Sequence, residues 1–189
     1  MRNPELWILR HGQTEWNAEG RKQGGRDSPL TALGRSQAAD QNRILRRTDL
    51  PDRTTFQVSP QGRATAAIAL DGIAVPVVDD RLREIELGDF EGKTDAELRA
   101  GWPDIMDRDD PLPWHFHAPG GETWGAFNAR IADWLADQRA PAVIVAHGML
   151  SAVLRGQVLG LDIAGISRLP GGQGIVWHIR DGVMTRLEA

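Results

Sequence analysis

The 189-residue sequence contains no cysteine, which excludes a disulfide scaffold, a thiolate zinc site and a cysteine nucleophile. It also lacks long apolar stretches, because no run approaches the roughly 20 residues that span a membrane. Positive charge is not in excess either, since 22 Lys and Arg stand against 26 Asp and Glu, a net charge of −4. Nucleic-acid binders usually carry a basic surface, so this balance argues against that class of protein.

The remaining composition is that of a globular protein, with 25% charged and 41% hydrophobic residues. A chain of this length suits one domain, and we expect a single domain over residues 1–189. The first apolar run ends at Arg10 and is too short for a signal peptide. We therefore expect a cytoplasmic protein with neither a membrane nor a nucleic acid as partner.

Short apolar runs alternate along the chain with stretches of helical periodicity. The runs predict strands at 6–9, 55–58, 74–78 and 142–146, and the periodic stretches predict helices at 31–47, 60–70, 123–135 and 148–158. A long loop is expected at 11–29, and Asp181-Gly182 is typical of a type I′ hairpin turn between two final strands. This alternation predicts an α/β/α three-layer fold with a mostly parallel sheet.

Glycines and prolines interrupt the pattern after residue 79, and we expect a lid or insertion at about 89–122 with one or two short helices. This segment carries a group of rings, namely Trp102, Trp114, His115, Phe116 and His117. These rings could form an aromatic wall for a substrate or pack within the lid. A His-x-His pair alone is weak support for a metal site, so neither a metal nor another cofactor is expected.

Polar residues follow the predicted strands where ligands collect in open parallel sheets, just beyond the carboxyl ends. Arg10 and His11 end the first strand, Arg63 follows the second, and Glu84 and His147 follow two others. This set suits phosphoryl transfer without a metal. Guanidinium groups pair with phosphate oxygens, a neutral imidazole attacks phosphorus, and a carboxylic acid protonates the departing alkoxide. Backbone N–H groups at the helix starts near Gly62 and Gly148 can add donors.

Several motifs then occur in an order that resembles the histidine phosphatase superfamily, also called the phosphoglycerate mutase-like family. They are LRHGQTEWN (9–17), GRKQG (20–24), DSPLT (27–31), SPQGRA (59–64), LREIELGDFEG (82–92), PGGET (119–123) and VAHG (145–148). One such motif would be weak, but the ordered set covers most of the chain. The resemblance implies a phosphoglycerate mutase-like fold and chemistry through a phosphohistidine.

The resemblance also implies a role for each matching residue. His11 would be the nucleophile, and Glu84 would be the acid and later the base. The phosphoryl oxygens would be held by Arg10, Arg63 and His147 with help from Asn17, and the pocket would be lined by Gln23, Gly24 and Gly148. Three departures affect the shape of the pocket and remove no catalytic group: Val58 before Ser59, Ala67 in place of a threonine, and Gly25-Arg26 in place of a frequent aromatic.

Three functions remain open at this point: a metal-independent phosphomonoesterase, a phosphoglycerate mutase-type enzyme and a non-catalytic phosphate-binding relative. The last is disfavoured because every core catalytic residue type is present. A mutase of phosphorylated acids must hold several negative charges, yet residues 84–123 are strongly acidic and lack the adjacent arginine pair of related mutases. We therefore predict a phosphatase acting on a small-molecule phosphate ester. Candidates among relatives include α-ribazole phosphate, phosphoserine and sugar phosphates. The oligomeric state stays open, with a homodimer as one option.

Overall fold

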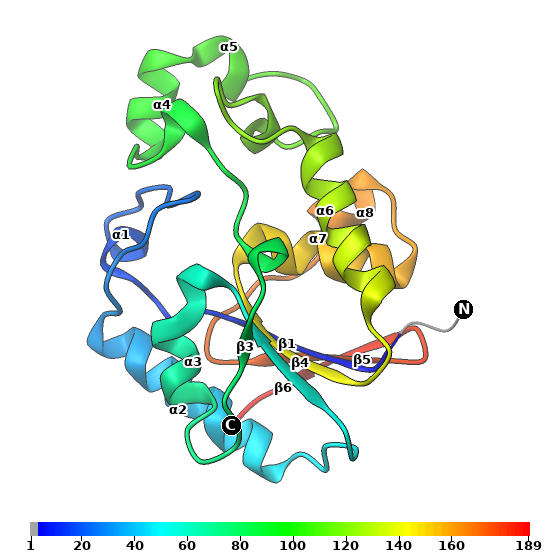
Figure 1. Cartoon of the computed structure of the whole chain (residues 1–189). Helices are drawn as coiled ribbons and strands as arrows, with labels where there is room; N and C mark the ends of the chain where they lie inside the picture. The colour runs from blue at the N-terminus through cyan, green and yellow to red at the C-terminus, as the bar shows by residue number, and fades with distance from the viewer. Residues whose placement is uncertain (1–3) are drawn as a thin grey trace.

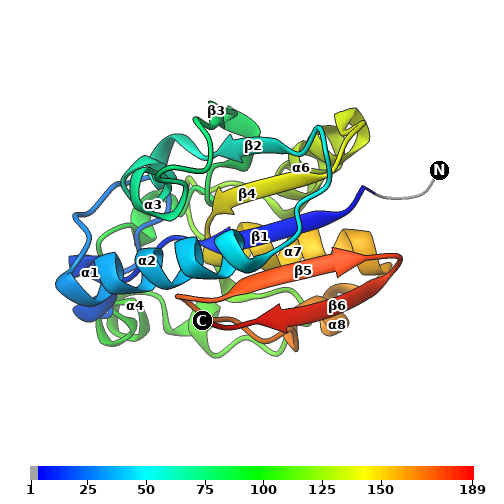
Figure 2. The ribbon, with the colours of Figure 1, turned by 90° about the horizontal axis from the view of Figure 1, so that it is seen from below.

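The computed structural model describes residues 4–189, apart from the side chain of Arg63. Its centre is a six-stranded sheet in the order β3-β2-β4-β1-β5-β6 (Figure 2). The strands are β1 (Leu6–Arg10), β2 (Thr55–Val58), β3 (Val77–Val78), β4 (Ala142–Ala146), β5 (Val176–Arg180) and β6 (Val183–Leu187). The first four are mutually parallel, whereas β5 and β6 add an antiparallel edge. The predicted mostly parallel sheet is confirmed.

Helices cover both faces of the sheet, which confirms the three-layer prediction. On one face lie α2 (Ala32–Arg47) and α3 (Arg63–Ala69); on the other lie α6 (Trp124–Asp137), α7 (Gly148–Leu159) and α8 (Ile163–Ser167), behind the sheet in Figure 2. Side chains alternate between the two cores along β1, because Leu6 and Ile8 join one cluster and Trp7 and Leu9 join the other.

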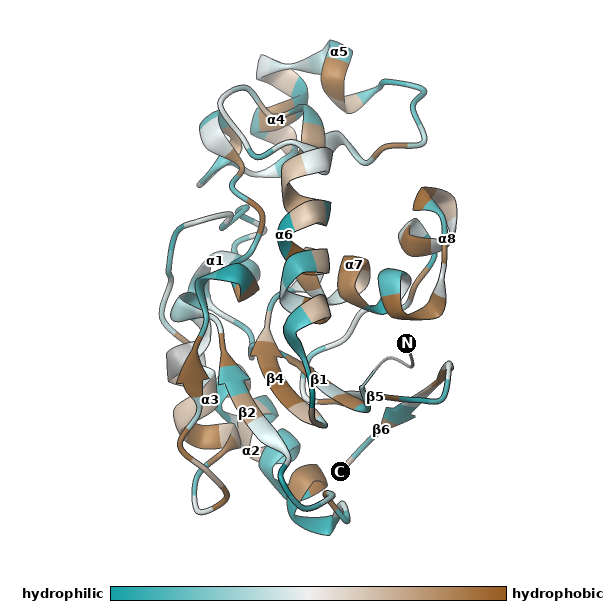
Figure 3. Ribbon diagram, turned by 45° about the vertical axis from the view of Figure 1, so that its right-hand side comes forward, coloured by the Kyte–Doolittle hydropathy of each residue, from teal (hydrophilic) through white to brown (hydrophobic). Residues whose placement is uncertain are grey.

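The central strands are apolar on both faces because both faces are covered. All five residues of β4 are buried, and Figure 3 colours this strand hydrophobic, whereas the edge strand β6 is largely hydrophilic. The β5–β6 turn has the predicted type I′ geometry, with positive φ at both Asp181 (53°) and Gly182 (77°). Two-sided burial thus fixes β1 and β4 as the rigid middle of the sheet.

Four local predictions differ from the structure. The expected loop at 11–29 contains α1 (Glu15–Ala18), and α8 was not predicted; both helices are too short to show a hydrophobic period. Pro60 begins a 3₁₀ turn, η1 (Pro60–Gly62), and α3 follows it. The strand expected at 74–78 shrinks to β3, because Pro76 has no N–H to give to a ladder.

The segment at 89–122 crosses the top of the molecule in Figure 1 and carries two short α-helices, as predicted. Its elements are η3 (Gly88–Phe90), α4 (Asp95–Gly101), α5 (Pro103–Met106) and η4 (Trp114–His117), and η2 (Asp80–Leu82) precedes it. The buried side chains of Phe90, Leu98 and Phe116 anchor it to the cluster under α6 and α7. Among residues 4–189, no helix is long and apolar enough to cross a membrane.

Candidate active site

A pocket of about 470 Å³ lies at the carboxyl ends of β1 and β4. It gathers every predicted site residue except Arg63, namely Arg10, His11, Asn17, Gln23, Gly24, Glu84, His147 and Gly148. Arg63 begins α3 and directly precedes Ala64, which lines the pocket. The side chain of Arg63 lies outside the part of the chain that the structure describes. The strand-end rule therefore located the pocket correctly.

His11 follows β1 directly and is buried, with 8% of its surface exposed. Its Nδ1 lies 2.8 Å from the carbonyl oxygen of Gly12. A carbonyl oxygen only accepts, so Nδ1 must donate the proton, and Nε2 keeps a free lone pair. Burial lowers the pKa of His11 to about 3, with further lowering by His147 and Arg10. The imidazole is therefore neutral and nucleophilic at neutral pH.

His147 is the N-cap residue of α7 and follows β4. Its ring lies 5.2 Å from that of His11, and its Nε2 is hydrogen-bonded to the Ser59 hydroxyl at 2.6 Å. Burial, and then the positive charges of Arg10 and Arg130, lower the pKa of His147 to about 3. The two buried imidazoles are thus both neutral and face the same space.

Arg10 brings a half-buried positive charge to the site. Its Nε is buried and has no hydrogen-bond partner, and burial lowers the pKa of the guanidinium while Glu84 opposes that shift. The guanidinium lies against the start of α7, where a Cβ added at Gly148 would come within 3.3 Å of its Cζ. A guanidinium with an unused, buried donor suits the binding of an anion.

Glu84 occupies the N-terminus of α7. Its Oε2 accepts from the N–H of Met149 at 3.0 Å, and its Oε1 accepts from Leu150 at 2.9 Å and from Ile85 at 3.2 Å. Met149 and Leu150 lie in the first turn of α7, so their N–H groups have no partner within the helix. An anionic ligand would use the same two donors. The carboxyl is thereby held in the pocket with His11 and Arg10.

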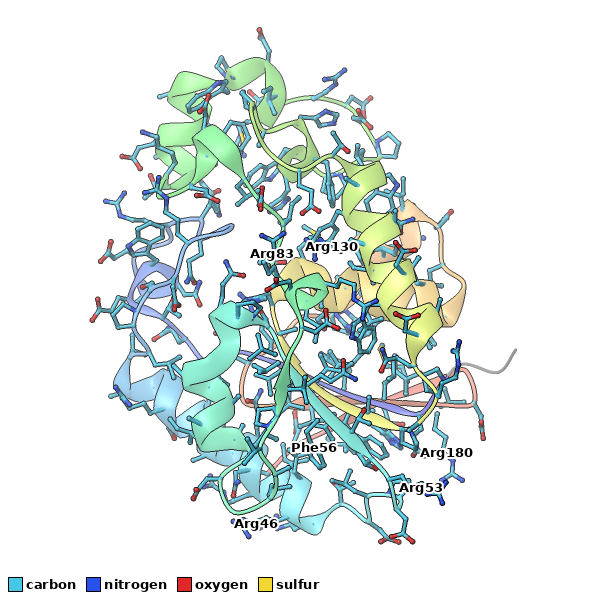
Figure 4. All side chains as sticks on the ribbon, viewed as in Figure 1. Arg46, Arg53, Phe56, Arg83, Arg130 and Arg180 are labelled. Atoms are coloured by element: carbon cyan, nitrogen blue, oxygen red, sulfur yellow. The ribbon has the colours of Figure 1, made fainter. Side chains whose placement is uncertain are left out.

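Arg130 of α6 fixes the segment that carries Glu84, a role that sequence reasoning missed. Its guanidinium donates to the carbonyls of Arg81 (2.7 Å), Arg83 (2.9 Å) and Glu84 (3.4 Å), and it pairs with Glu122 at 2.7 Å. Figure 4 shows Arg83 and Arg130 together, well away from Arg46, Arg53 and Arg180. The sequence does contain one sign of this contact, because Glu122, the glutamate of the PGGET motif, is the residue that pairs with Arg130.

A hydrogen-bonded amide network forms the opposite wall. Asn17 donates to Gln23 Oε1 at 3.1 Å, and Gln173 donates to Asn17 Oδ1 at 3.3 Å and to the carbonyl of His11 at 3.0 Å. Gln61 donates to the carbonyl of Gly24 at 3.2 Å and accepts from the N–H of Glu84 at 3.1 Å. Sequence reasoning assigned no role to Gln173, because the GGQG stretch around it has no specific meaning by itself.

Glycines permit a close backbone contact beneath the nucleophile. A Cβ added at Gly12 would lie 2.1 Å from the carbonyl oxygen of Gly34, and one at Gly34 would lie 2.0 Å from that of Gln13. Thr65 Oγ1 accepts from the N–H of Gly12 at 3.2 Å. The start of α2 and the turn after β1 therefore pack without side chains between them, which fixes the place of His11.

The expected backbone donors near Gly62 need one correction. The N–H of Gly62 is not available to a ligand, because it donates to the carbonyl of Ser59 at 2.9 Å within the 3₁₀ turn. Residues 83–87 form no strand, so strand alternation does not separate Glu86 from Glu84. Glu86 is nevertheless exposed and pairs with Arg83 at 3.2 Å, outside the pocket that holds Glu84.

The rings of the 89–122 segment divide between the two expected roles. Trp102 stacks edge-on against Phe90, Phe116 is buried beside Phe127, and Trp114 also packs on Phe90. Of these rings only His115 lines the pocket, while His117 lies 3.2 Å from Asp110. The aromatic wall is therefore mostly packing. Within residues 4–189 no group of three or more His, Asp or Glu side chains is arranged to hold a metal ion.

Comparison with known proteins places this geometry in a family. The sequence pattern of the histidine phosphatase superfamily (branch 1) matches residues 6–180. The chain is 35% identical to glucosyl-3-phosphoglycerate phosphatase of Mycolicibacterium vanbaalenii over 86% of this chain and 77% of that one. It is 32% identical to a probable phosphoglycerate mutase GpmB of an Enterobacter species, over 87% and 79%. The solved mycobacterial glucosyl-3-phosphoglycerate phosphatase, complexed with VO3, superposes with a TM-score of 0.76 at 31% identity, covering 98% and 97%.

Proposed function

The chain belongs to the histidine phosphatase superfamily, and we propose that it is a metal-independent phosphomonoesterase that acts through a phosphohistidine at His11. The observation that carries this proposal is the state of His11. The ring is neutral, its Nδ1 proton is held by Gly12, and it stands beside the half-buried guanidinium of Arg10. Both named phosphatases and named mutases occur among the relatives.

In the first step Nε2 of His11 attacks the phosphorus atom, and the bond from phosphorus to the alcohol oxygen breaks. The bonding electrons go to that oxygen, which takes the proton of the Glu84 carboxylic acid and leaves as the alcohol. Arg10 and His147 stabilise the negative charge on the phosphoryl oxygens. The N–H groups of Met149 and Leu150, which donate to the Glu84 carboxyl, can donate to a bound phosphoryl group instead, and a carboxyl displaced from them is free to face the leaving group.

In the second step a water molecule attacks the phosphohistidine. The Glu84 carboxylate takes a proton from this water as its oxygen bonds to phosphorus, and the electrons of the P–N bond return to Nε2. Inorganic phosphate leaves and the acid form of Glu84 is restored. Each proton taken from Glu84 in the first step is thereby replaced in the second.

Mutase activity is the alternative, in which the phosphoryl group returns to an organic acceptor instead of water. The cations of the outer pocket, Arg21, Lys22 and Arg26, are each paired with a carboxylate, which favours hydrolysis because a mutase of phosphorylated acids must retain an anionic acceptor. Incubation with a phosphorylated acid in ¹⁸O-water separates the two reactions. Hydrolysis transfers ¹⁸O into phosphate, whereas a mutase forms an isomer without it.

The decisive experiment is rapid-quench labelling with a ³²P-phosphate ester in the presence of a chelator, since the proposal needs no metal ion. We expect an acid-labile, base-stable phosphoenzyme in the natural protein and neither label nor turnover in His11→Ala. Circular dichroism checks that the variant folds. Turnover by His11→Ala near that of the natural protein would disprove the assignment of the nucleophile.

A further inference from the structure

Three cations stand at the outer part of the pocket, and each is bound to a carboxylate. Arg21 pairs with Glu19 at 2.8 Å and with Glu97 at 3.4 Å. Lys22 pairs with Asp95 at 2.9 Å, and Arg26 pairs with Glu91 at 3.0 Å. These pairs are partly exposed, so each contributes little to stability, but each offsets the charge that its cation presents to a ligand.

The charge balance differs at the inner end. Arg10 is the one cation among the described lining residues that makes no ion pair, and it lies beside His11, where the phosphoryl group binds. Asp27 adds a further negative charge to the lining. A substrate with a second anionic group outside the phosphate would therefore meet compensated cations and an added carboxylate.

The rest of the lining carries uncharged hydrogen-bonding groups, many of them bonded to one another or to the backbone. These are the side chains of Gln13, Thr14, Asn17, Gln23, Ser28, Gln61 and Gln173. Amides and hydroxyls both donate and accept, which matches the hydroxyl groups of an alcohol that carries several of them. The pocket volume of about 470 Å³ is ample for a six-carbon chain.

His115 adds a fixed ring to this wall. It stacks on Trp114 with ring centroids 3.7 Å apart and an angle of 17°, and Trp114 in turn packs on the buried Phe90. Its Nδ1 is enclosed by protein without a partner, so Nε2 is the nitrogen that a ligand in the pocket can reach. Burial lowers the pKa of His115 to about 4, so its ring is neutral.

His115 and Glu84 line the same pocket. The charge of Glu84 acts on the His115 ring, and it opposes the lowering of the pKa that burial causes. Glu84 must reach the oxygen of the leaving alcohol under the proposed mechanism. Lys22, whose charge also acts on the ring, belongs to the outer part of the pocket, so His115 is available to the alcohol part of the substrate.

We propose that the outer pocket selects phosphate monoesters of uncharged alcohols with several hydroxyl groups, and that His115 Nε2 is a specificity-determining hydrogen-bond contact to one of those hydroxyls. This inference rests on the proposed phosphatase function. It names the class of substrate for the same site. It also assigns one side chain of the 89–122 segment, His115, to recognition of the leaving alcohol.

The first test compares two substrates that differ at one carbon. Sorbitol 6-phosphate and 6-phosphogluconate share a six-carbon chain, with a hydroxymethyl group in the first where the second has a carboxylate. We expect kcat/KM to be at least about tenfold higher for sorbitol 6-phosphate. Equal values, or a preference for 6-phosphogluconate, would overturn the inference. Hydrolysis of p-nitrophenyl phosphate is measured alongside, and its absence would count against the phosphatase function itself.

The second test uses His115→Phe, which keeps a flat ring on Trp114 and removes the hydrogen bond. We expect kcat/KM for sorbitol 6-phosphate to fall about tenfold, mainly through KM, the effect of one lost hydrogen bond. The loss on p-nitrophenyl phosphate, which has no hydroxyl to read, should be several times smaller. Equal losses on both substrates, or no loss on either, would refute the role of His115.

The ion pairs are tested with Asp95→Asn, which releases Lys22 from its partner. We expect the ratio of kcat/KM for 6-phosphogluconate to that for sorbitol 6-phosphate to rise about threefold. Asp104→Asn is the matched control, because it removes the same charge from an exposed position of α5. A ratio that changes equally in the two variants would show that net charge, and not the Lys22 pair, sets the preference.

Discussion

The two ends of the pocket are built differently. The inner end uses residues that directly follow central strands, and His11 and His147 are only 8% and 5% exposed. The outer end uses loops and short helices, joined by ion pairs such as Lys22–Asp95, in which the aspartate side chain is 64% exposed. The residues proposed for catalysis thus stand on the rigid core, while the ion pairs of the outer end stand near the surface, where substitution costs little stability.

The substitution with the largest expected effect is Glu84→Gln, which keeps the size of the side chain and removes its acidic proton. Loss of a general acid costs roughly 100- to 10,000-fold for an alkyl phosphate, because an alkoxide departs poorly without a proton. Formation of the phosphoenzyme from p-nitrophenyl phosphate should be far less affected, since p-nitrophenolate is already a stable anion. The burst phase of a stopped-flow assay reports this first step alone.

The control for Glu84 is Glu86→Gln, at an exposed position paired with Arg83. It should leave both substrates close to their original rates. A leaving-group-dependent loss in Glu86→Gln and not in Glu84→Gln would mean that the acid has been misassigned by two residues.

A second test contrasts an arginine that lines the pocket with one that lies outside it. Arg10→Ala removes a partner of the phosphoryl group and should lower kcat/KM by about 30- to 1,000-fold, or roughly 2–4 kcal/mol of transition-state stabilisation. Arg83→Ala should cost far less, because this side chain bonds Asp80 and Glu86 outside the pocket. Equal losses in steady-state assays would contradict the placement of the anion site at the inner end.

The last test concerns stability against pH and not the rate of the reaction. The pKa of His11 and of His147 is lowered to about 3, and that of His115 to about 4, against about 6.5 in the unfolded chain. Below pH 6.5 the unfolded chain therefore binds protons that the folded chain does not, so the free energy of unfolding falls as the pH falls. Between pH 6.5 and 5 the loss is at most about 2 kcal/mol per histidine.

Urea unfolding at the two pH values measures this loss, and the interval lies above the usual range of carboxyl titration. His115→Phe should reduce the drop by removing one of the three contributions. A free energy of unfolding that is unchanged between pH 6.5 and 5 would show that these imidazoles are not held neutral.

Much of the fold was predictable because its strong elements carry their own signals. The five buried residues of β4 form one apolar run, and Thr31 and Thr123 cap the helices α2 and α6 as expected. The failures were short elements. The four residues of α1 depend on the capping box between Thr14 and Asn17, and a single turn shows no period that a sequence pattern can reveal.

The inner end of the site was predictable for the same reason, since Arg10, His11 and His147 follow strands whose positions were clear. The outer end was not. The contacts of Arg130 join α6 to residues 81–84 across 46 to 49 positions of sequence, and Gln173 reaches His11 across 162. Long-range hydrogen bonds of this kind leave no local periodicity, so only the folded chain shows them.

The strand order also has a consequence for synthesis of the chain. β1 is made first, yet its two neighbours are β4 and β5, so its backbone finds no sheet partner until residues 142–146 have emerged and no second one until 176–180. During this interval the apolar residues Leu6–Leu9 have no neighbouring strand to pair with. Pairing between strands that lie far apart in the sequence slows folding. A nascent chain that ends before residue 142 therefore lacks the sheet partners of β1, and with them the support that orients His11 at the end of this strand.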